Sequence, residues 1–92
     1  MRIFKTRQQL EGFIDTCADE ELRSLLQQRL EELADYQLHE VGYFYIVEDA
    51  ADLVTLPQLP EVREEFTNWV ELVYVISDDG FGLEVFIPRG LI

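Results

Sequence analysis

The feature that most constrains the fold of this chain is the stretch from Trp69 to Pro88, WVELVYVISDDGFGLEVFIP, which has the pattern of a β-hairpin. Two runs rich in β-branched and aromatic residues, 69–76 and 81–87, flank an Asp-Gly dipeptide. Asp-Gly accepts the positive φ angles of a type I′ turn. The sequence therefore predicts two antiparallel strands that are joined by a tight turn at Asp79 and Gly80.

The length of the turn sets which side chains share a face of this hairpin. A two-residue loop pairs Tyr74 with Val85 and makes one face wholly apolar. A three-residue loop pairs Tyr74 with Glu84 instead and spreads carboxylates over both faces. Because a one-residue slip exchanges the core and solvent faces, we favour the two-residue loop and keep the longer loop as the alternative. The apolar face then holds Leu72, Tyr74, Leu83, Val85 and Ile87, and the opposite face holds Trp69, Val73, Val75 and Phe86.

Two amphipathic helices are predicted before the hairpin. The first, at about 7–15, follows Thr6 and Gln9, which have the spacing of a capping box. The second lies within 18–36, where acidic residues crowd the first turn and suit the helix dipole. Both have apolar residues at helical spacing. The two stripes are Leu10, Phe13, Ile14 and Cys17, then Ala18, Leu22, Leu25, Leu26, Leu30 and Leu33.

A third strand is predicted at 38–47, LHEVGYFYIV, between the second helix and the hairpin. Both of its faces carry large apolar groups, so the sequence does not choose which face meets the helices. The alternatives are the face with Tyr43 and Tyr45 and the face with Phe44 and Ile46.

Three shorter segments complete the chain. The acidic segment 48–60 is predicted to hold a helical turn that Asp49 caps, with Leu53 and Leu56 facing inward. Residues 61–66, EVREEF, are predicted to form a second short helix after a proline. At the start of the chain, residues 3–4 either begin a short strand or close one end of the core.

Together these elements predict one α+β domain over residues 1–92. Two N-terminal helices are expected to pack on one face of a mainly antiparallel sheet of about three strands. The order is helix, helix, strand, short helices, strand and strand, with the hairpin at the C-terminal end. No apolar run approaches the roughly 20 residues of a membrane helix. The single cysteine, Cys17, fits a reducing compartment, so we expect a cytoplasmic protein.

Charge gives the clearest indication of function. Nineteen acidic residues against seven basic ones give a net charge of −12, and no Lys or Arg lies between Leu30 and Val62. Such a field repels nucleic acid and anionic lipid, and it attracts basic partners. We therefore expect no direct nucleic acid binding and no membrane binding. The acidic surface expected to meet a basic partner is made by Glu40, Glu48, Asp49, Asp52 and Glu61.

Motifs for catalysis or cofactor binding are missing from the sequence. It has no GxSxG motif, no glycine-rich phosphate loop and no CxxC pair. His39, the only histidine, has no metal-ligand spacing around it, and Asp78 and Asp79 are explained by the turn. Cys17 fits the apolar stripe of the first helix. We therefore expect no enzymatic activity, no cofactor and no metal site.

The sheet face that the helices leave open is the candidate interface. Its aromatic and β-branched area is too large to leave in water. Either a partner covers it, most commonly a second copy in a homodimer, or residues 49–66 and the C-terminal tail fold over it. The candidate interface residues are Trp69, Val73, Val75, Phe86, Tyr43 and Tyr45.

The sequence thus favours a small acidic, non-enzymatic protein-binding domain. An inhibitor, antitoxin or immunity-like protein that covers a basic partner surface is the concrete form of this hypothesis. The first alternative is a homodimeric structural or regulatory module whose acidity serves solubility only. A weaker alternative is a small-molecule or metal-binding domain.

Overall fold

The computed structural model describes residues 1–32, 42–56, 60–75 and 82–92. Within them it has two α-helices and a mixed sheet of five strands, which confirms the α+β class and corrects the expected number of strands. No helix in this part of the chain is long and apolar enough to cross a membrane. The elements are β1 (Arg2–Phe4), α1 (Arg7–Thr16), α2 (Glu20–Glu32), β2 (Gly42–Ile46), the 3-10 helix η1 (Ala50–Thr55), β3 (Glu61–Glu65), β4 (Trp69–Val75), β5 (Gly82–Pro88) and the 3-10 turn η2 (Arg89–Leu91).

The two α-helices begin at side-chain caps. Thr6 Oγ1 accepts a hydrogen bond of 3.2 Å from the backbone N–H of Gln9, which is one half of the predicted capping box, while the side chain of Gln9 accepts from the N–H of Lys5. Asp19 Oδ1 accepts one of 3.0 Å from the N–H of Leu22, so α2 begins at the next residue after Asp19. The predicted apolar stripes are largely confirmed. Leu10, Ile14, Cys17, Leu22, Leu25 and Leu26 are buried, Phe13 and Leu30 are partly buried, Ala18 is exposed, and Leu33 lies outside the described residues.

The sheet has the strand order β1-β2-β5-β4-β3. The pairs β1 with β2, β5 with β4, and β4 with β3 are antiparallel, whereas β2 and β5 are parallel. The sheet is therefore mainly antiparallel, as predicted. Its one parallel pair arises because η1, β3 and β4 lie between β2 and β5 in the chain, so β5 enters the sheet in the direction of β2.

The hairpin of β4 and β5 is confirmed, but its predicted register is wrong by two residues. Tyr74 pairs with Leu83, where the two-residue turn placed Val85. The three-residue turn, which pairs Tyr74 with Glu84, is wrong as well. A shift of two residues keeps the same side chains on the same face, because side chains alternate along a strand. Residues 76–81, and with them the predicted turn at Asp79 and Gly80, lie outside the described residues.

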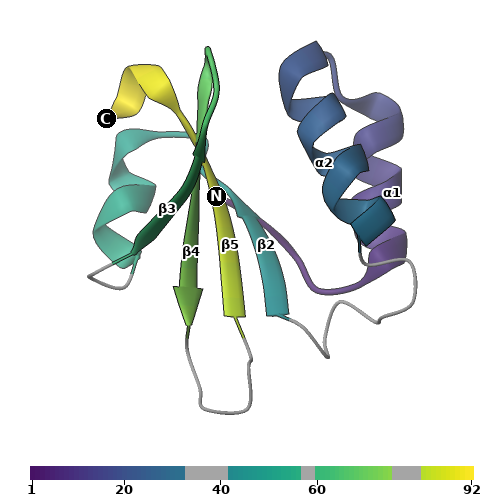
Figure 1. The fold of residues 1–92 in the computed structure, drawn as a ribbon, viewed down its shortest axis with the longest axis horizontal. Coiled ribbons are helices and arrows are strands. Elements are labelled where there is room, and N and C mark those ends of the chain that lie inside the picture. The colour runs from purple at the N-terminus through teal and green to yellow at the C-terminus, as the bar shows by residue number, and fades with distance from the viewer. Residues whose placement is uncertain (33–41, 57–59, 76–81) are drawn as a thin grey trace.

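The helices cover the opposite face of the sheet from the one predicted. Trp69 and Phe86, expected on the open face, are buried under α1 and α2 with exposures of 8% and 0%. Phe44 and Ile46 face the same way, which settles the orientation of β2. Figure 1 shows the two helices on one side of the sheet and η1 and η2 on the other. Phe44, Trp69 and Phe86 therefore share one core cluster with apolar residues of the two helices.

The predicted apolar face of the hairpin forms a second core cluster. Two leucines of the acidic segment 48–60, Leu53 and Leu56, pack against it. Leu91 of the C-terminal tail does so as well. Of the alternative in which residues 49–66 and the C-terminal tail cover a sheet face, only part is seen. The segment with η1 and the tail cover the face that was expected to meet the helices, whereas Glu61–Glu65 joins the sheet as β3. The cluster consists of Val47, Val70, Leu72, Tyr74, Leu83, Val85 and Ile87.

The predicted short helix at 61–66 is wrong, because Glu61–Glu65 forms strand β3. Val62 pairs with Leu72 on β4, and the register then shifts before Glu64. Glutamate is depleted in strands, so the local sequence EVREE gives little sign of this conformation. Pairing with the edge of β4, which would otherwise lack a neighbour on that side, overrides the local preference.

Candidate functional site

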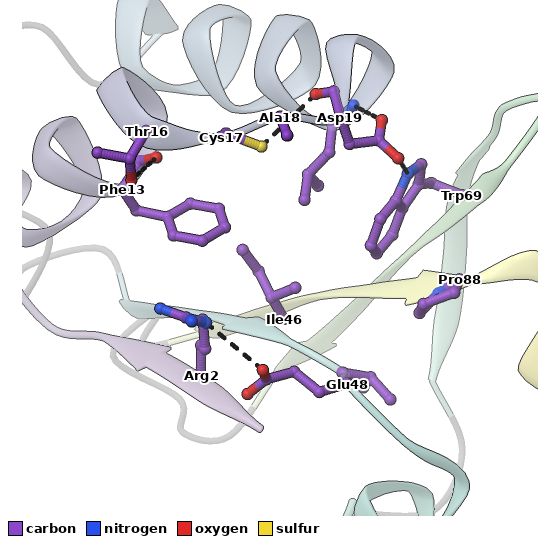
Figure 2. Close-up of a pocket in the computed structure, with 12 residues that line it drawn as sticks. Arg2, Phe13, Thr16, Cys17, Ala18, Asp19, Ile46, Glu48, Trp69 and Pro88 are labelled. Carbon is purple, nitrogen blue, oxygen red and sulfur yellow. Dashed lines mark hydrogen bonds and ion pairs between the residues drawn. The ribbon is translucent and has the colours of Figure 1, made fainter.

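A pocket of about 390 Å³ lies between the turn that joins α1 to α2 and the helix-facing side of the sheet. Figure 2 shows the rings of Phe13 and Trp69 on opposite sides of it, with Ile46 from β2 between them. Cys17, which is 8% exposed, lines it too, and its Sγ lies 3.5 Å from the backbone carbonyl of Asp19. Cys17 is thus a core residue of the first helix stripe, as predicted. We call this cavity the helix-side pocket.

The indole of Trp69 is held in place by α2. Its Nε1 donates a hydrogen bond of 3.2 Å to Asp19 Oδ2, while the other oxygen of that carboxylate caps the helix. One carboxylate therefore satisfies the helix terminus and the polar edge of a buried aromatic ring. This contact ties β4 to the start of α2 (Figure 2).

An ion pair stands at the rim of the helix-side pocket. Arg2 Nε lies 3.5 Å from Glu48 Oε2, and the guanidinium carbon of Arg2 lies 5.3 Å from the centre of the Phe13 ring. The side chains of Arg2 and Glu48 are 56% and 50% exposed, so solvent screens their attraction. A pocket with apolar walls and an ion pair at its rim can hold a small amphipathic molecule. They do not form the convergent polar constellation of a catalytic centre.

A buried charge cluster lies deeper under α2. Arg29 Nη2 is 2.8 Å from Glu71 Oε2 on β4, and Arg29 Nη1 is 2.8 Å from Glu32 Oε1. Arg29 Nε also lies 3.8 Å from Glu84 Oε2 on β5. The hydrogen bond to Glu71 is the main cause that raises the pKa of Arg29 above its ordinary value, while burial opposes the rise. Arg29 is therefore permanently charged, and the cluster is a structural one.

Several carboxylates of the acidic segment 48–60 make contacts within the chain. Asp49 Oδ1 accepts a hydrogen bond of 2.8 Å from the N–H of Ala51, so the predicted cap is confirmed. Asp52 Oδ2 accepts from the N–H groups of Glu48 and Asp49 and lies 3.0 Å from the amino group of Met1. The N–H of Glu48, followed by that amino group, lowers the pKa of Asp52.

The five residues of the predicted acidic surface are thus not equivalent. The structure brings Glu48, Asp49 and Asp52 together at the start of η1, where each has a partner within the chain. Glu61 lies apart from them on β3 and is exposed. Glu40 lies outside the described residues, as does His39.

The six residues of the predicted interface are divided between the two faces of the sheet. Trp69 and Phe86 are buried under the helices, so they offer no open surface in the single chain. Tyr43 and Tyr45 are partly buried against the second core cluster, on the other face. Val73 is partly buried on β4, and the side chain of Val75 lies outside the described part of the structure.

A second cavity, of about 340 Å³, opens on the face of the sheet that η1 and η2 cover. Val62 on β3 is 54% exposed at its edge. The guanidinium of Arg89 donates hydrogen bonds to the backbone carbonyls of Phe66 and Thr67. We call this cavity the η1–β3 groove. It is lined by Leu53, Val62, Val70, Leu72, Ile87, Arg89 and Ile92.

The η1–β3 groove was not predictable from the residues alone, because it depends on β3 being a strand. In the structure, its surroundings are marked by exposed large apolar residues. Val62 lies on its wall, and Val54, which is 86% exposed, follows Leu53 in η1. Within the described residues, no group of three His, Cys, Asp or Glu side chains is placed to hold a metal ion.

Comparisons with protein-family models, with curated proteins and with solved structures found no match for this chain. A function must therefore be inferred from the geometry of the site itself.

Proposed function

We propose that this chain is a small, non-enzymatic protein-binding domain that presents an acidic surface to a basic partner. An inhibitor, antitoxin or immunity-like protein is the concrete form of this function. It needs no cofactor and does not bind nucleic acid directly. A cytoplasmic location goes with it, because the only cysteine, Cys17, is a free thiol.

The observation that carries the proposal is the pairing of acidic and apolar surface at β3. Glu61 and Val62 are neighbours on this strand, and both are exposed. Val62 lines the η1–β3 groove. The other residues that line this groove are aliphatic, apart from Arg89. Interfaces commonly combine an apolar centre with a charged rim. The edge strand β3 has both parts, with Val62 on the side of the groove and Glu61 on the other side.

The net charge of −12 supplies the first step of binding. Long-range attraction raises the rate at which a basic protein meets this surface, and the effect falls with ionic strength. Burial of apolar side chains in the groove would then supply most of the affinity. Val62 takes the role of apolar anchor, because Trp69, a candidate interface residue in the sequence, is buried under the helices.

The test is capture of proteins from the source cell by the immobilised chain at rising salt concentration, with identification by mass spectrometry. We expect the retained proteins to be basic and to be released between about 0.05 and 0.5 M salt, since exposed charges are screened in this range. Glu61→Lys should lower the association rate of the retained protein several-fold.

Glu31→Lys is the matched control for Glu61→Lys. It makes the same change of charge at an exposed position on α2, which lies on the other side of the sheet from the η1–β3 groove. If both variants lower the association rate equally, only the total charge matters. Capture that does not depend on salt would refute the proposal.

The first alternative is a homodimeric structural or regulatory module. Exposed apolar residues at both edges of the sheet favour it, Ile3 at 43% on β1 and Val62 at 54% on β3. A dimer that stays intact at low salt, together with an unchanged phenotype after Glu61→Lys, would support this module over the acidic binder. Sedimentation equilibrium measures the dimer directly.

The second alternative is a small-molecule binding domain, and the helix-side pocket favours it. Its volume of about 390 Å³ and its aromatic walls, Phe13 and Trp69, suit a small amphipathic ligand. A thermal-shift screen of metabolites and metal ions tests it, because a ligand that binds only the folded chain raises the melting temperature. A screen without any such rise would count against this alternative.

A further inference from the structure

The outer edge of β3 is the feature that extends the proposed function. β3 is the last strand of the sheet order, so its outer backbone groups have no strand partner among the described residues. Unpaired N–H and C=O groups of an edge strand are a template for another extended chain. The η1–β3 groove opens beside the same edge at Val62.

The two faces of β3 differ in chemistry. Val62 pairs with Leu72, a member of the second core cluster, so it belongs to the face that carries the groove. Glu61 pairs with Val73 and so belongs to the opposite face, because neighbours on a strand alternate. A chain that pairs with β3 therefore meets an apolar cavity on one face and a carboxylate on the other.

We propose that the partner contributes an extended segment of alternating apolar and basic residues, which adds to the sheet as a new strand beside β3. Its apolar side chains enter the η1–β3 groove next to Val62, and its Lys or Arg side chains face Glu61. This inference rests on the proposed function and specifies the form in which the basic partner binds.

Charge complementarity selects this occupant. The β3 sequence EVREE has three acids and one base. Glu61 has no ion pair within the described part of the chain, and the guanidinium of Arg89 is committed to backbone carbonyls. A basic segment is therefore attracted to this edge, and an acidic one is repelled.

A second copy of the chain is the competing occupant. Pairing β3 with β3 would bring two EVREE strands together, and like charges opposite one another destabilise a strand pair. The net charge of −12 on each copy adds a long-range repulsion. The other edge, β1, is only three residues long, and its Arg2 is already paired with Glu48. A foreign segment is favoured over self-pairing.

The test titrates the full chain, labelled with ¹⁵N, with a peptide of about ten alternating lysine and valine residues, the upper length of an ordinary strand. We expect chemical-shift changes at β3 and Leu53, and slower hydrogen exchange at β3 amides on binding. The control peptide has the same side chains with alternate backbone amides methylated. It should bind about tenfold more weakly, because it cannot form the ladder.

Two variants of equal net charge locate the site on the chain. Val62→Ser removes the exposed aliphatic group at the groove, and Ile3→Ser makes a similar change on the other edge strand. We expect Val62→Ser to weaken peptide binding about tenfold and Ile3→Ser to leave it unchanged. Circular dichroism checks that both variants stay folded.

Several outcomes would overturn strand addition. These are equal binding of the methylated peptide, equal effects of the two serine variants, or shift changes confined to the helices. A dimer of the wild-type chain that Val62→Ser dissociates would assign the groove to a second copy. If protein capture still depends on salt and on Glu61 in any of these cases, the proposed function stands and only the strand addition fails.

Discussion

Arg29 on α2 and Glu71 on β4 form a buried, two-point ion pair across the boundary between the helices and the sheet. Arg29 Nε lies 3.0 Å from Glu71 Oε1 while its Nη2 contacts the other oxygen. The two side chains are 4% and 0% exposed. Because a guanidinium meets both oxygens of a carboxylate in few orientations, the pair fixes where α2 sits on the sheet.

Replacing Arg29 alone should strongly destabilise the fold. In Arg29→Met, the Glu71 carboxylate stays buried without its main positive partner. Breaking a buried pair in this way costs about 3–5 kcal/mol, because the remaining charge is left uncompensated. We expect a loss of this size in the free energy of unfolding, measured by urea denaturation with linear extrapolation.

Replacing both partners separates the cost of the orphaned charge from the value of the pair. Arg29→Met combined with Glu71→Leu should recover most of the stability that Arg29→Met loses, since well-packed apolar residues can replace a buried pair. A double-mutant cycle gives the coupling energy. Losses that simply add in the double variant would show that Arg29 and Glu71 do not interact as described.

The parts of the fold that were predicted correctly are those with strong local patterns. Leucines at helical spacing predicted α2, and alternating β-branched and aromatic residues predicted β4 and β5. Strand β3 was missed because its EVREE sequence favours no strand by itself, and only pairing with β4 gives it this conformation. Element types thus followed local sequence, while the strand count depended on tertiary contacts.

The covered face of the sheet could not be predicted, because both faces of β2 and of the hairpin carry large apolar groups. The choice depends on contacts between residues far apart in the chain, such as Arg29 with Glu71. One signal was present in the sequence. Arg29 lies seven residues after Leu22, in the middle of the apolar stripe, where a base requires an acidic partner. The η1–β3 groove carried no comparable signal.

The cap of η1 should affect how stably η1 packs on the second core cluster. Asp49→Ala removes the acceptor for the N–H of Ala51 and should cost about 1 kcal/mol, as other N-cap deletions do. Asp49→Ser keeps a cap and should lose less. Hydrogen exchange measured at residues 50–55 checks this, with faster exchange expected only in the alanine variant. Unchanged exchange in that variant would mean that Leu53 and Leu56 hold η1 without the cap.

Asp19 should contribute twice to stability, through the start of α2 and through Trp69. Asp19→Ala removes both acceptors and should cost about 2 kcal/mol, whereas Asp19→Ser keeps a helix cap and should cost about half of that. Trp69 is the only tryptophan, so its fluorescence reports on the lost indole contact. We expect the emission to change in both variants. A serine variant as unstable as the alanine variant would assign the whole effect to the indole.

The phenol of Tyr74 should make the fold sensitive to alkaline pH. Tyr74 is 5% exposed in the second core cluster, and burial raises its pKa above the ordinary 10.0. As the pH rises, the unfolded chain therefore loses this proton before the folded chain does. The stabilisation is complete below the unfolded pKa and is lost as the pH rises through the folded one.

We therefore expect the free energy of unfolding to fall from about pH 10 upward, measured by urea unfolding at a series of pH values. Tyr74→Phe removes the ionisable group and keeps the ring, so its stability should fall less steeply over the same range. In the tyrosinate absorbance of the folded wild type, the Tyr74 phenol should ionise late, and this late step should be missing in Tyr74→Phe. Equal slopes for the wild type and Tyr74→Phe would place the alkaline sensitivity elsewhere in the chain, because no other change distinguishes the two proteins.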